Sequence, residues 1–177
     1  MSSGSDHKPA GAKAGANGPA PVSDTSAKNL HRDGDILIAG EPTPAGLEAL
    51  HAQGVKTVID LRTEPDKMAT EKELAQKLGM KYFAIPMQSN ELTDQQAAEL
   101  LRAMKQHDHG EVLIHCAGGN RAAGAYGYYL GATGQCPIQE ALERAKNAGL
   151  KNPQLAESVR QRLTTRPAGA PATQPHR

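Results

Sequence analysis

The sequence predicts an α/β fold with a mainly parallel central sheet flanked by helices. The order of apolar patterns along the chain supports this prediction. Short apolar runs of strand length alternate along the chain with longer segments whose apolar residues recur at helical spacing. Such alternation is typical of parallel strands joined by helices. In sheets of this kind the ligand site lies beyond the carboxyl ends of the strands.

Four segments have the pattern of strands. Pro86 predicts that the third bends or ends early, because proline cannot donate a hydrogen bond within a sheet. The fourth contains Val112, Leu113 and Ile114 in succession, which is typical of a strand buried on both faces. The predicted strands span residues 35–40, 55–61, 81–87 and 112–114.

Six segments have helical patterns. The first begins after Thr43, and Thr93 with Gln96 forms the pattern of a capping box. Residues 62–66 are predicted to form a loop that Pro65 breaks. The predicted helices span residues 44–53, 68–78, 94–106, 122–132, 137–149 and 153–163.

Three glycines, Gly124, Gly127 and Gly131, recur at helical spacing in the fourth predicted helix. A glycine has no Cβ atom, so another backbone can approach it closely. We expect these residues to let the helix pack closely on the sheet.

Both ends of the chain differ in composition from its middle. Residues 1–28 are mostly small or polar, and residues 164–177 contain three prolines and no large apolar side chain. Such segments bury too little apolar surface to offset the entropy lost on folding. We therefore expect disordered tails at 1–28 and 164–177. Residues 29–163, about 135 residues, have the size of one domain.

The composition argues against several classes of protein. The formal net charge of the 177 residues is +1, with acidic and basic residues interspersed, which disfavours nucleic-acid and membrane-surface binding. Two cysteines, Cys116 and Cys136, are too few for a disulfide scaffold. The chain has neither an apolar run of membrane-spanning length nor a signal-peptide pattern, so we expect a cytoplasmic protein.

The stretch from Glu111 to Gly124, EVLIHCAGGNRAAG, carries the candidate chemistry. Cys116 follows the fourth strand and precedes a helix, where free N–H groups and the helix dipole favour a thiolate. The same N–H groups, together with the guanidinium of Arg121, suit a small anionic substrate. We expect a thiolate enzyme without metal or other cofactor. The anion-binding loop would comprise Ala117, Gly118, Gly119, Asn120 and Ala122.

Within this loop, Gly118 and Gly119 are expected to supply positive φ angles or close backbone approach. Asn120 would brace the loop or adopt a left-handed conformation. The side chains of His115 and Cys116 would point to opposite faces if strand geometry persists, so His115 would orient the loop.

Several residues outside the loop have two interpretations each. Asp60 and Arg62 end the second strand and would either line the mouth of the site or form a structural ion pair. Glu91 is the one acid on the loop after the third strand, where it could protonate a leaving group. Asp94 is better explained as a favourable charge in the first turn of a helix. Cys136 would be a bystander or a resolving thiol.

These motifs resemble those of the cysteine-dependent phosphatase superfamily, which includes tyrosine and dual-specificity phosphatases. The resemblance is strongest to the bacterial phosphatase-like domain named from beta-lactamase-hydrolase-like proteins, and it covers residues 30–150. It rests on CAGGNR after a strand, on IAGEPTPAGLEAL and VKTVIDLR, and on IPM before a helix. The resemblance implies that Cys116 is a nucleophile that forms a cysteinyl-phosphate, and that Arg121 binds the anion.

Two features depart from the pattern of these phosphatases. Four residues separate Cys116 from Arg121 where those enzymes have five, and Ala122 stands where they usually have Ser or Thr. The shorter loop is similar in length to that of rhodaneses, which carry a persulfide on cysteine. Three functions therefore remain open. They are hydrolysis of a phosphate monoester, sulfur transfer through a persulfide on Cys116 with a persulfidated partner, and anion binding without catalysis.

Overall fold

A computed structural model describes residues 11–107 and 110–165. These residues form six strands and six helices, which confirms the predicted α/β class. The strands are β1 (Ala20–Pro21), β2 (His31–Asp33), β3 (Ile36–Ala39), β4 (Val55–Asp60), β5 (Lys81–Ala84) and β6 (Glu111–His115). The helices are α1 (Pro44–Ala52), α2 (Pro65–Lys77), α3 (Asp94–Gln106), α4 (Asn120–Ala132), α5 (Ile138–Asn147) and α6 (Pro153–Thr164). Within this part of the chain, no helix combines the length and apolar character needed to cross a bilayer.

The sheet is mainly parallel, as predicted. Its strand order is β1-β2-β3-β6-β4-β5, with β3, β6, β4 and β5 parallel and the β1–β2 and β2–β3 pairs antiparallel. The strand before the cysteine, β6, pairs on both sides, because Ile114 lies opposite Ile38 of β3 and Ile59 of β4. The two antiparallel strands were not predicted, since β1 has two residues and β2 reads HRD, without an apolar run.

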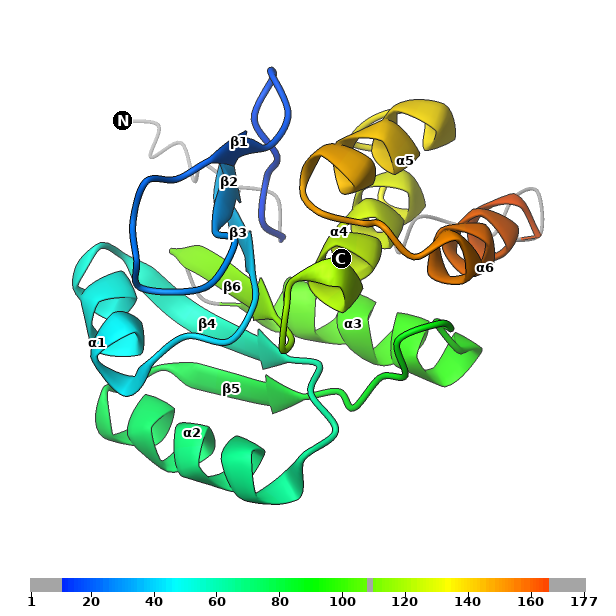
Figure 1. Ribbon diagram of the computed structural model, residues 1–177. Coiled ribbons are helices and arrows are strands. Elements are labelled where there is room, and N and C mark those ends of the chain that lie inside the picture. Colours follow the sequence, from blue (N-terminus) through cyan, green and yellow to red (C-terminus); the bar gives the residue numbers. More distant parts are fainter. Residues whose placement is uncertain (1–10, 108–109, 166–177) are drawn as a thin grey trace, which may run out of the picture.

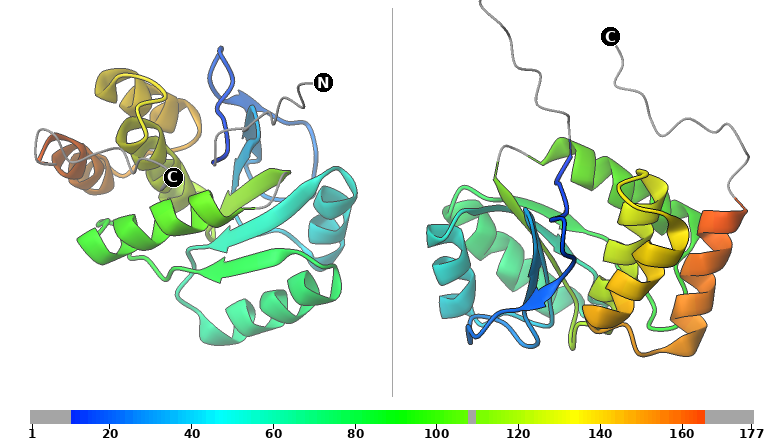
Figure 2. Two further views of the ribbon diagram at one scale, coloured as in Figure 1. Left: turned by 180° about the vertical axis from the view of Figure 1, so that it is seen from behind. Right: turned by 90° about the horizontal axis from the view of Figure 1, so that it is seen from above.

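The helices cover both faces of the sheet (Figures 1 and 2). Leu37, Val58 and Leu113 pack in one apolar cluster with side chains of α1 and α2. Ile38 and Ile114 belong to a second cluster with α3, α4, α5 and α6. Neighbouring residues of one strand contribute to different clusters because successive side chains point to opposite faces.

The glycines of α4 allow close packing, but of helices rather than of the sheet as predicted. A Cβ atom at Gly127 would lie 2.6 Å from the Cβ of Ala145 in α5. At Gly124 and Gly131 it would lie 3.0 and 2.9 Å from side-chain atoms of α6 leucines. The glycines therefore face α5 and α6, which pack on the side of α4 turned away from the sheet (Figure 1).

Several predicted boundaries shift in the structure. Pro65, predicted to break a loop, is the first residue of α2, where its missing N–H costs no hydrogen bond and its fixed φ suits a helix. The third predicted strand ends at Ala84, before Pro86. The capping box forms as predicted, with reciprocal bonds between Thr93 and Gln96.

The segment predicted as an N-terminal tail differs most from the structure. Residues 11–28 are described, and Ala12 is fully buried. The Gly15 N–H donates to Asp33 Oδ1 (2.6 Å), and Arg144 Nη1 donates to the Gly15 carbonyl (2.8 Å). Hydrogen bonds between its backbone and side chains of β2 and α5 thus hold a segment that has few large apolar side chains. Residues 1–10 and 166–177 of the predicted tails lie outside the described residues.

Candidate active site

The cysteine loop, residues 116–121, connects the end of β6 to the first turn of α4. Cys116 is 1% exposed, and its Sγ accepts a hydrogen bond from the Gly119 N–H (3.1 Å). Gly119 precedes α4 and has φ +106°, a conformation that side chains rarely adopt. This left-handed turn directs the N–H of Gly119 back towards the sulfur. Gly118 does not have a positive φ, and a Cβ at this position would meet no atom within 4 Å. Neither the backbone conformation nor the packing therefore requires a glycine at position 118.

The N-terminus of α4 supplies further donors for an anion. The Ala123 N–H bonds to the Gly119 carbonyl (2.9 Å), so the intrahelical hydrogen bonds begin there. The N–H groups of residues 120–122 precede that first bond and have no partner within the helix. The first turn of α4 contains no acidic side chain. The helix dipole and these N–H groups therefore favour an anion beside the Cys116 sulfur.

Arg121 lies across the carboxyl edge of the sheet. Its Nη1 donates to the carbonyls of Met87 (3.0 Å) and Leu61 (3.4 Å), which follow β5 and β4. Its side chain is half-buried rather than extended into solvent. In the described part of the chain, its Nε and Nη2 make no hydrogen bond to protein, which leaves them able to bind an anion.

Asn120 braces the loop through its side chain and is helical rather than left-handed. Its Oδ1 accepts hydrogen bonds from the N–H groups of Lys151 (2.8 Å) and Asn152 (3.0 Å). Asn152 also donates to the Ser89 carbonyl (3.0 Å). These contacts join the cysteine loop to α6 and to the segment after β5. The Oδ1 of Asn120 is thus engaged by protein, and its backbone N–H remains for a ligand.

His115 and Cys116 point to opposite faces of the sheet. The imidazole of His115 is fully buried, with Nε2 lying 2.6 Å from Glu71 Oε2 of α2 and Nδ1 lying 3.3 Å from the Cys116 carbonyl oxygen. This geometry orients the backbone of the loop and does not place the imidazole against the sulfur. Sequence reasoning did not identify Glu71, and no local pattern distinguishes it from Glu73 of the same helix.

Asp60 and Arg62 form a buried ion pair behind the loop. Arg62 Nη2 and Nε lie 2.8 and 3.0 Å from the Asp60 carboxylate, and Arg62 Nη1 lies 2.7 Å from Glu41 Oε1. Burial by itself would raise the pKa of Asp60, but hydrogen bonds from Arg62 and Tyr82 outweigh burial and lower that pKa. Burial opposes the charge of Arg62 as well, yet the carboxylates of Asp60, Glu71 and Glu41 raise its pKa. The pair therefore remains charged, and Arg62, which also lies 3.4 Å from Glu71, joins the end of β4 to α2.

One group of side chains in this network has the composition of a metal site. Ligand atoms of Asp60, Glu71 and His115 lie within 4.8 Å of one another. Arg62 donates to Asp60 and lies 3.4 Å from Glu71, so a guanidinium already neutralises the carboxylates that a metal ion would need. We interpret the group as an ion-pair network.

The structure does not bring Glu91 to the cysteine loop. Glu91 is exposed and lies in a shallow groove beside Pro153 and Glu157 of α6. The neighbouring Leu92 is fixed by a hydrogen bond from its N–H to Ser158 Oγ (3.0 Å). Asp94, also considered as an acid, pairs with Arg162 of α6. The structure therefore places neither of these two acids to protonate a leaving group at Cys116.

Cys136 lies beyond the other end of α4. The 13 residues of that helix span about 20 Å, which separates Cys136 from Cys116 too far for a disulfide. Burial raises the pKa of the Cys136 thiol. Both features argue against a role as resolving thiol.

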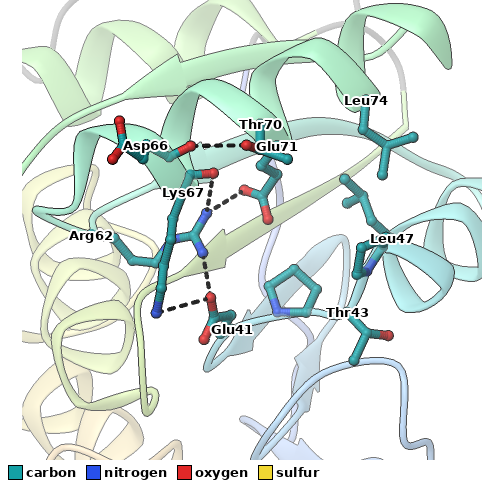
Figure 3. A pocket seen from close by; sticks show the side chains of 11 residues that line it. Glu41, Thr43, Leu47, Arg62, Asp66, Lys67, Thr70, Glu71 and Leu74 are labelled. Atoms are coloured by element: carbon teal, nitrogen blue, oxygen red, sulfur yellow. Dashed lines mark hydrogen bonds and ion pairs between the residues drawn. The ribbon is translucent and has the colours of Figure 1, made fainter.

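A cavity of about 350 Å³ lies between α1 and α2 (Figure 3). Its apolar walls include Leu47 and Leu74, and its charged end contains Glu41, Arg62 and Glu71. The cysteine loop contributes none of the described residues that line the cavity. The cavity therefore adjoins the ion-pair network but does not contain the reactive group.

Comparison with known proteins agrees with this architecture. Two solved structures resemble the chain. One is of a protein from Shewanella putrefaciens CN-32, with a TM-score of 0.66 and 22% identity, and the match covers 82% of this chain and 97% of the other. The second is of TpbA from P. aeruginosa, with a TM-score of 0.62 and 22% identity, and the match covers 86% of this chain and 91% of TpbA. At this identity they establish the fold alone. A curated relative, the beta-lactamase hydrolase-like protein of Agrobacterium fabrum, is 32% identical over 96 residues, which are 51% of this chain and 22% of the relative.

The remaining comparison covers most of the domain. A family model described as "DSP-PTPase phosphatase fused to NAD+ Kinase" matches residues 20–158. The matched residues include the cysteine loop, the ion-pair network and all of the parallel strands. This chain belongs to that family of the cysteine-dependent phosphatase superfamily.

Proposed function

We propose that this chain hydrolyses phosphate monoesters through a cysteinyl-phosphate on Cys116. The observation that carries the proposal is the position of the Cys116 sulfur. It accepts a hydrogen bond from the Gly119 N–H and lies at the N-terminus of α4, and Arg121 lies in the first turn of that helix. Family membership supports phosphatase chemistry. A second structure of TpbA, similar in fold to this chain with a TM-score of 0.59 at 19% identity, is of its complex with phosphotyrosine.

The proposed reaction has two steps. The Cys116 thiolate attacks phosphorus, an S–P bond forms, and the P–O bond to the leaving group breaks with its electron pair on oxygen. Arg121 and the N–H groups of residues 120–122 bind the non-bridging oxygens, whose charge grows in the transition state. Water then attacks phosphorus, the S–P bond breaks, and inorganic phosphate and the thiolate are released.

The surroundings of the loop determine which substrates would react fastest. The acid that the sequence offered for protonating the leaving group, Glu91, faces α6, and the carboxylate of Glu41, whose N–H donates to the Ala117 carbonyl, is paired with Arg62. A leaving group that is stable as an anion, such as a phenolate, needs less help than an alkoxide. We therefore propose aryl phosphates, phosphotyrosine included, as the preferred class. A reducing compartment such as the cytoplasm suits the chemistry, because Cys116 must remain a free thiol.

Sulfur transfer is the second candidate, because four residues separate Cys116 from Arg121. Assays of the wild type and of Cys116→Ser with para-nitrophenyl phosphate, and with thiosulfate plus cyanide, separate the candidates. Phosphate release that Cys116→Ser abolishes supports the hydrolase. Thiocyanate formation without phosphate release would replace it with a sulfurtransferase, and inactivity in both assays would indicate anion binding without catalysis.

A further inference from the structure

A residue far from the cysteine loop in sequence holds one of its peptide groups. Asn29 lies between β1 and β2, and its Nδ2 donates a hydrogen bond to the carbonyl of Gly118 (2.9 Å). The position that a Cβ would occupy on Gly119 lies 3.8 Å from the Cβ of Asn29. The side chain of Asn29 therefore lies against the outer side of the loop.

The contact matters because of which peptide it holds. The Gly118 carbonyl and the Gly119 N–H belong to one peptide unit, and in a trans peptide these two groups point in opposite directions. Asn29 binds the carbonyl on the outer side, and the N–H donates to Cys116 Sγ on the inner side (3.1 Å). The two hydrogen bonds thus fix the same peptide plane from both sides.

Glycine at position 119 allows this peptide to adopt either of two orientations, because its backbone populates positive and negative φ about equally. Gly119 has φ +106°, whereas a half-turn of the peptide would bring its φ into the ordinary negative region. Gly118 is exposed, and a Cβ at this position would meet no atom within 4 Å, so no packed side chain at Gly118 fixes the peptide. The rotated peptide would present a carbonyl oxygen, in place of an N–H, to the sulfur and to a bound anion.

Asn29 is itself held in an unusual conformation. It is the one non-glycine residue with positive φ (50°) in the described part of the chain. Asparagine tolerates this region better than most residues, and such outliers often mark functional positions. The segment is anchored on both sides, because the Gly40 N–H donates to the Lys28 carbonyl (2.7 Å) and His31 Nδ1 lies 2.9 Å from the Asn29 carbonyl oxygen.

We propose that Asn29 is a positioning residue for the reaction at Cys116. By binding the Gly118 carbonyl it keeps the Gly119 N–H directed at the sulfur, which favours the thiolate and preserves a donor for the anion. The inference deepens the proposed function, since it assigns a residue outside the loop to the same site.

Three substitutions in a Cys136→Ser background test the proposal. Asn29→Gly keeps the freedom to adopt positive φ but removes the donor. Asn29→Asp keeps size and shape but presents an oxygen to the Gly118 carbonyl. Lys28→Ala is the matched control, because it changes the neighbouring exposed side chain and leaves the donor in place.

The main readout is the rate at which iodoacetamide alkylates Cys116 at neutral pH, followed by mass spectrometry. We expect about a 3- to 10-fold slower reaction in Asn29→Gly, the effect of losing one hydrogen bond, and a larger loss in Asn29→Asp. We expect kcat for para-nitrophenyl phosphate to fall in parallel. Lys28→Ala should react like the parent protein.

Two further measurements make the result decisive. Thermal unfolding of Asn29→Gly within a few degrees of the parent would show that slower alkylation reflects the loop and not a loss of folding. Alkylation needs no phosphatase activity, so slower reaction in both Asn29 variants would support the inference even if the wild type hydrolysed no phosphate ester. Equal alkylation rates in the parent and both Asn29 variants would overturn it.

Discussion

The imidazole of His115 and the carboxylate of Glu71 lie 2.6 Å apart, in a contact that joins the strand before the cysteine to α2. His115 is fully buried, so this carboxylate satisfies a ring nitrogen that water cannot reach. The contact connects the cysteine loop to the ion-pair network of Asp60 and Arg62.

Removal of this carboxylate should weaken both the fold and the site. Glu71→Ala leaves His115 Nε2 without its partner, and we expect the free energy of unfolding to fall by about 1–3 kcal/mol. Glu71→Gln keeps an oxygen acceptor and should lose less. Urea unfolding measures both, with Glu73→Ala, an exposed acid of the same helix, as control. An Ala variant as stable as the control would show that the contact contributes little.

Arg121 should not be replaceable by lysine. Its planar group can bind the Met87 carbonyl through one nitrogen and an anion through others, whereas an ammonium cannot do both in this geometry. We expect kcat/KM for para-nitrophenyl phosphate to fall about 100-fold or more in Arg121→Lys. Arg160→Lys on the exposed face of α6 is the control and should keep full activity. Full activity of Arg121→Lys would exclude a role in binding the transition state.

A substitution at Ala122, the residue after Arg121, should speed the second step of the proposed reaction. Ala122 is fully buried beside the cysteine loop and lacks the hydroxyl that helps the thiolate leave in related phosphatases. We expect the cysteinyl-phosphate to accumulate in the wild type and to turn over faster in Ala122→Ser. Rapid-quench measurement of the burst of para-nitrophenol checks this. The control, Ala123→Ser, places a hydroxyl one helical position further on and should leave the burst unchanged.

Acid should destabilise the fold through Asp60. The pKa of Asp60 is lowered from its ordinary 3.8, so its contribution is complete above about pH 4 and is lost as the pH falls through the lower folded value. Asp60→Asn should be less stable at pH 7 by about 3–5 kcal/mol, because Arg62 loses a buried partner. It should also lose less stability below pH 4 than the wild type. Urea unfolding at pH 7 and pH 3 measures both effects, and Asp66→Asn on exposed α2 surface serves as control.

Two glycines of α4 should respond differently to the same substitution. In Gly127→Ala the new methyl group would meet the Cβ of Ala145 at 2.6 Å, and we expect a loss of about 1–3 kcal/mol. In Gly124→Ala it would meet the flexible end of Leu155 at 3.0 Å, so the better helix propensity of alanine should offset most of the cost. Thermal unfolding compares them. Equal stability of the two variants would contradict the close packing of α4 on α5.

The elements that the sequence predicted are those that depend on neighbouring residues. An apolar run, a cysteine, two glycines and an arginine in succession were enough to predict β6, the cysteine loop and the start of α4. Strand and helix patterns repeat over a few residues, so the fold class could be predicted as well. The spacing of the glycines in α4 predicted that another element packs closely on this helix. The spacing could not show whether that element was the sheet or a neighbouring helix.

The contacts that only the tertiary structure decided join residues distant in sequence. Asn29 and Gly118 are 89 positions apart, and His115 and Glu71 are 44 apart. The packing of residues 11–28 likewise depends on a surface built from Asp33, Tyr129 and Arg144. No local pattern records such pairs, because each forms only when the packed core brings separate segments together.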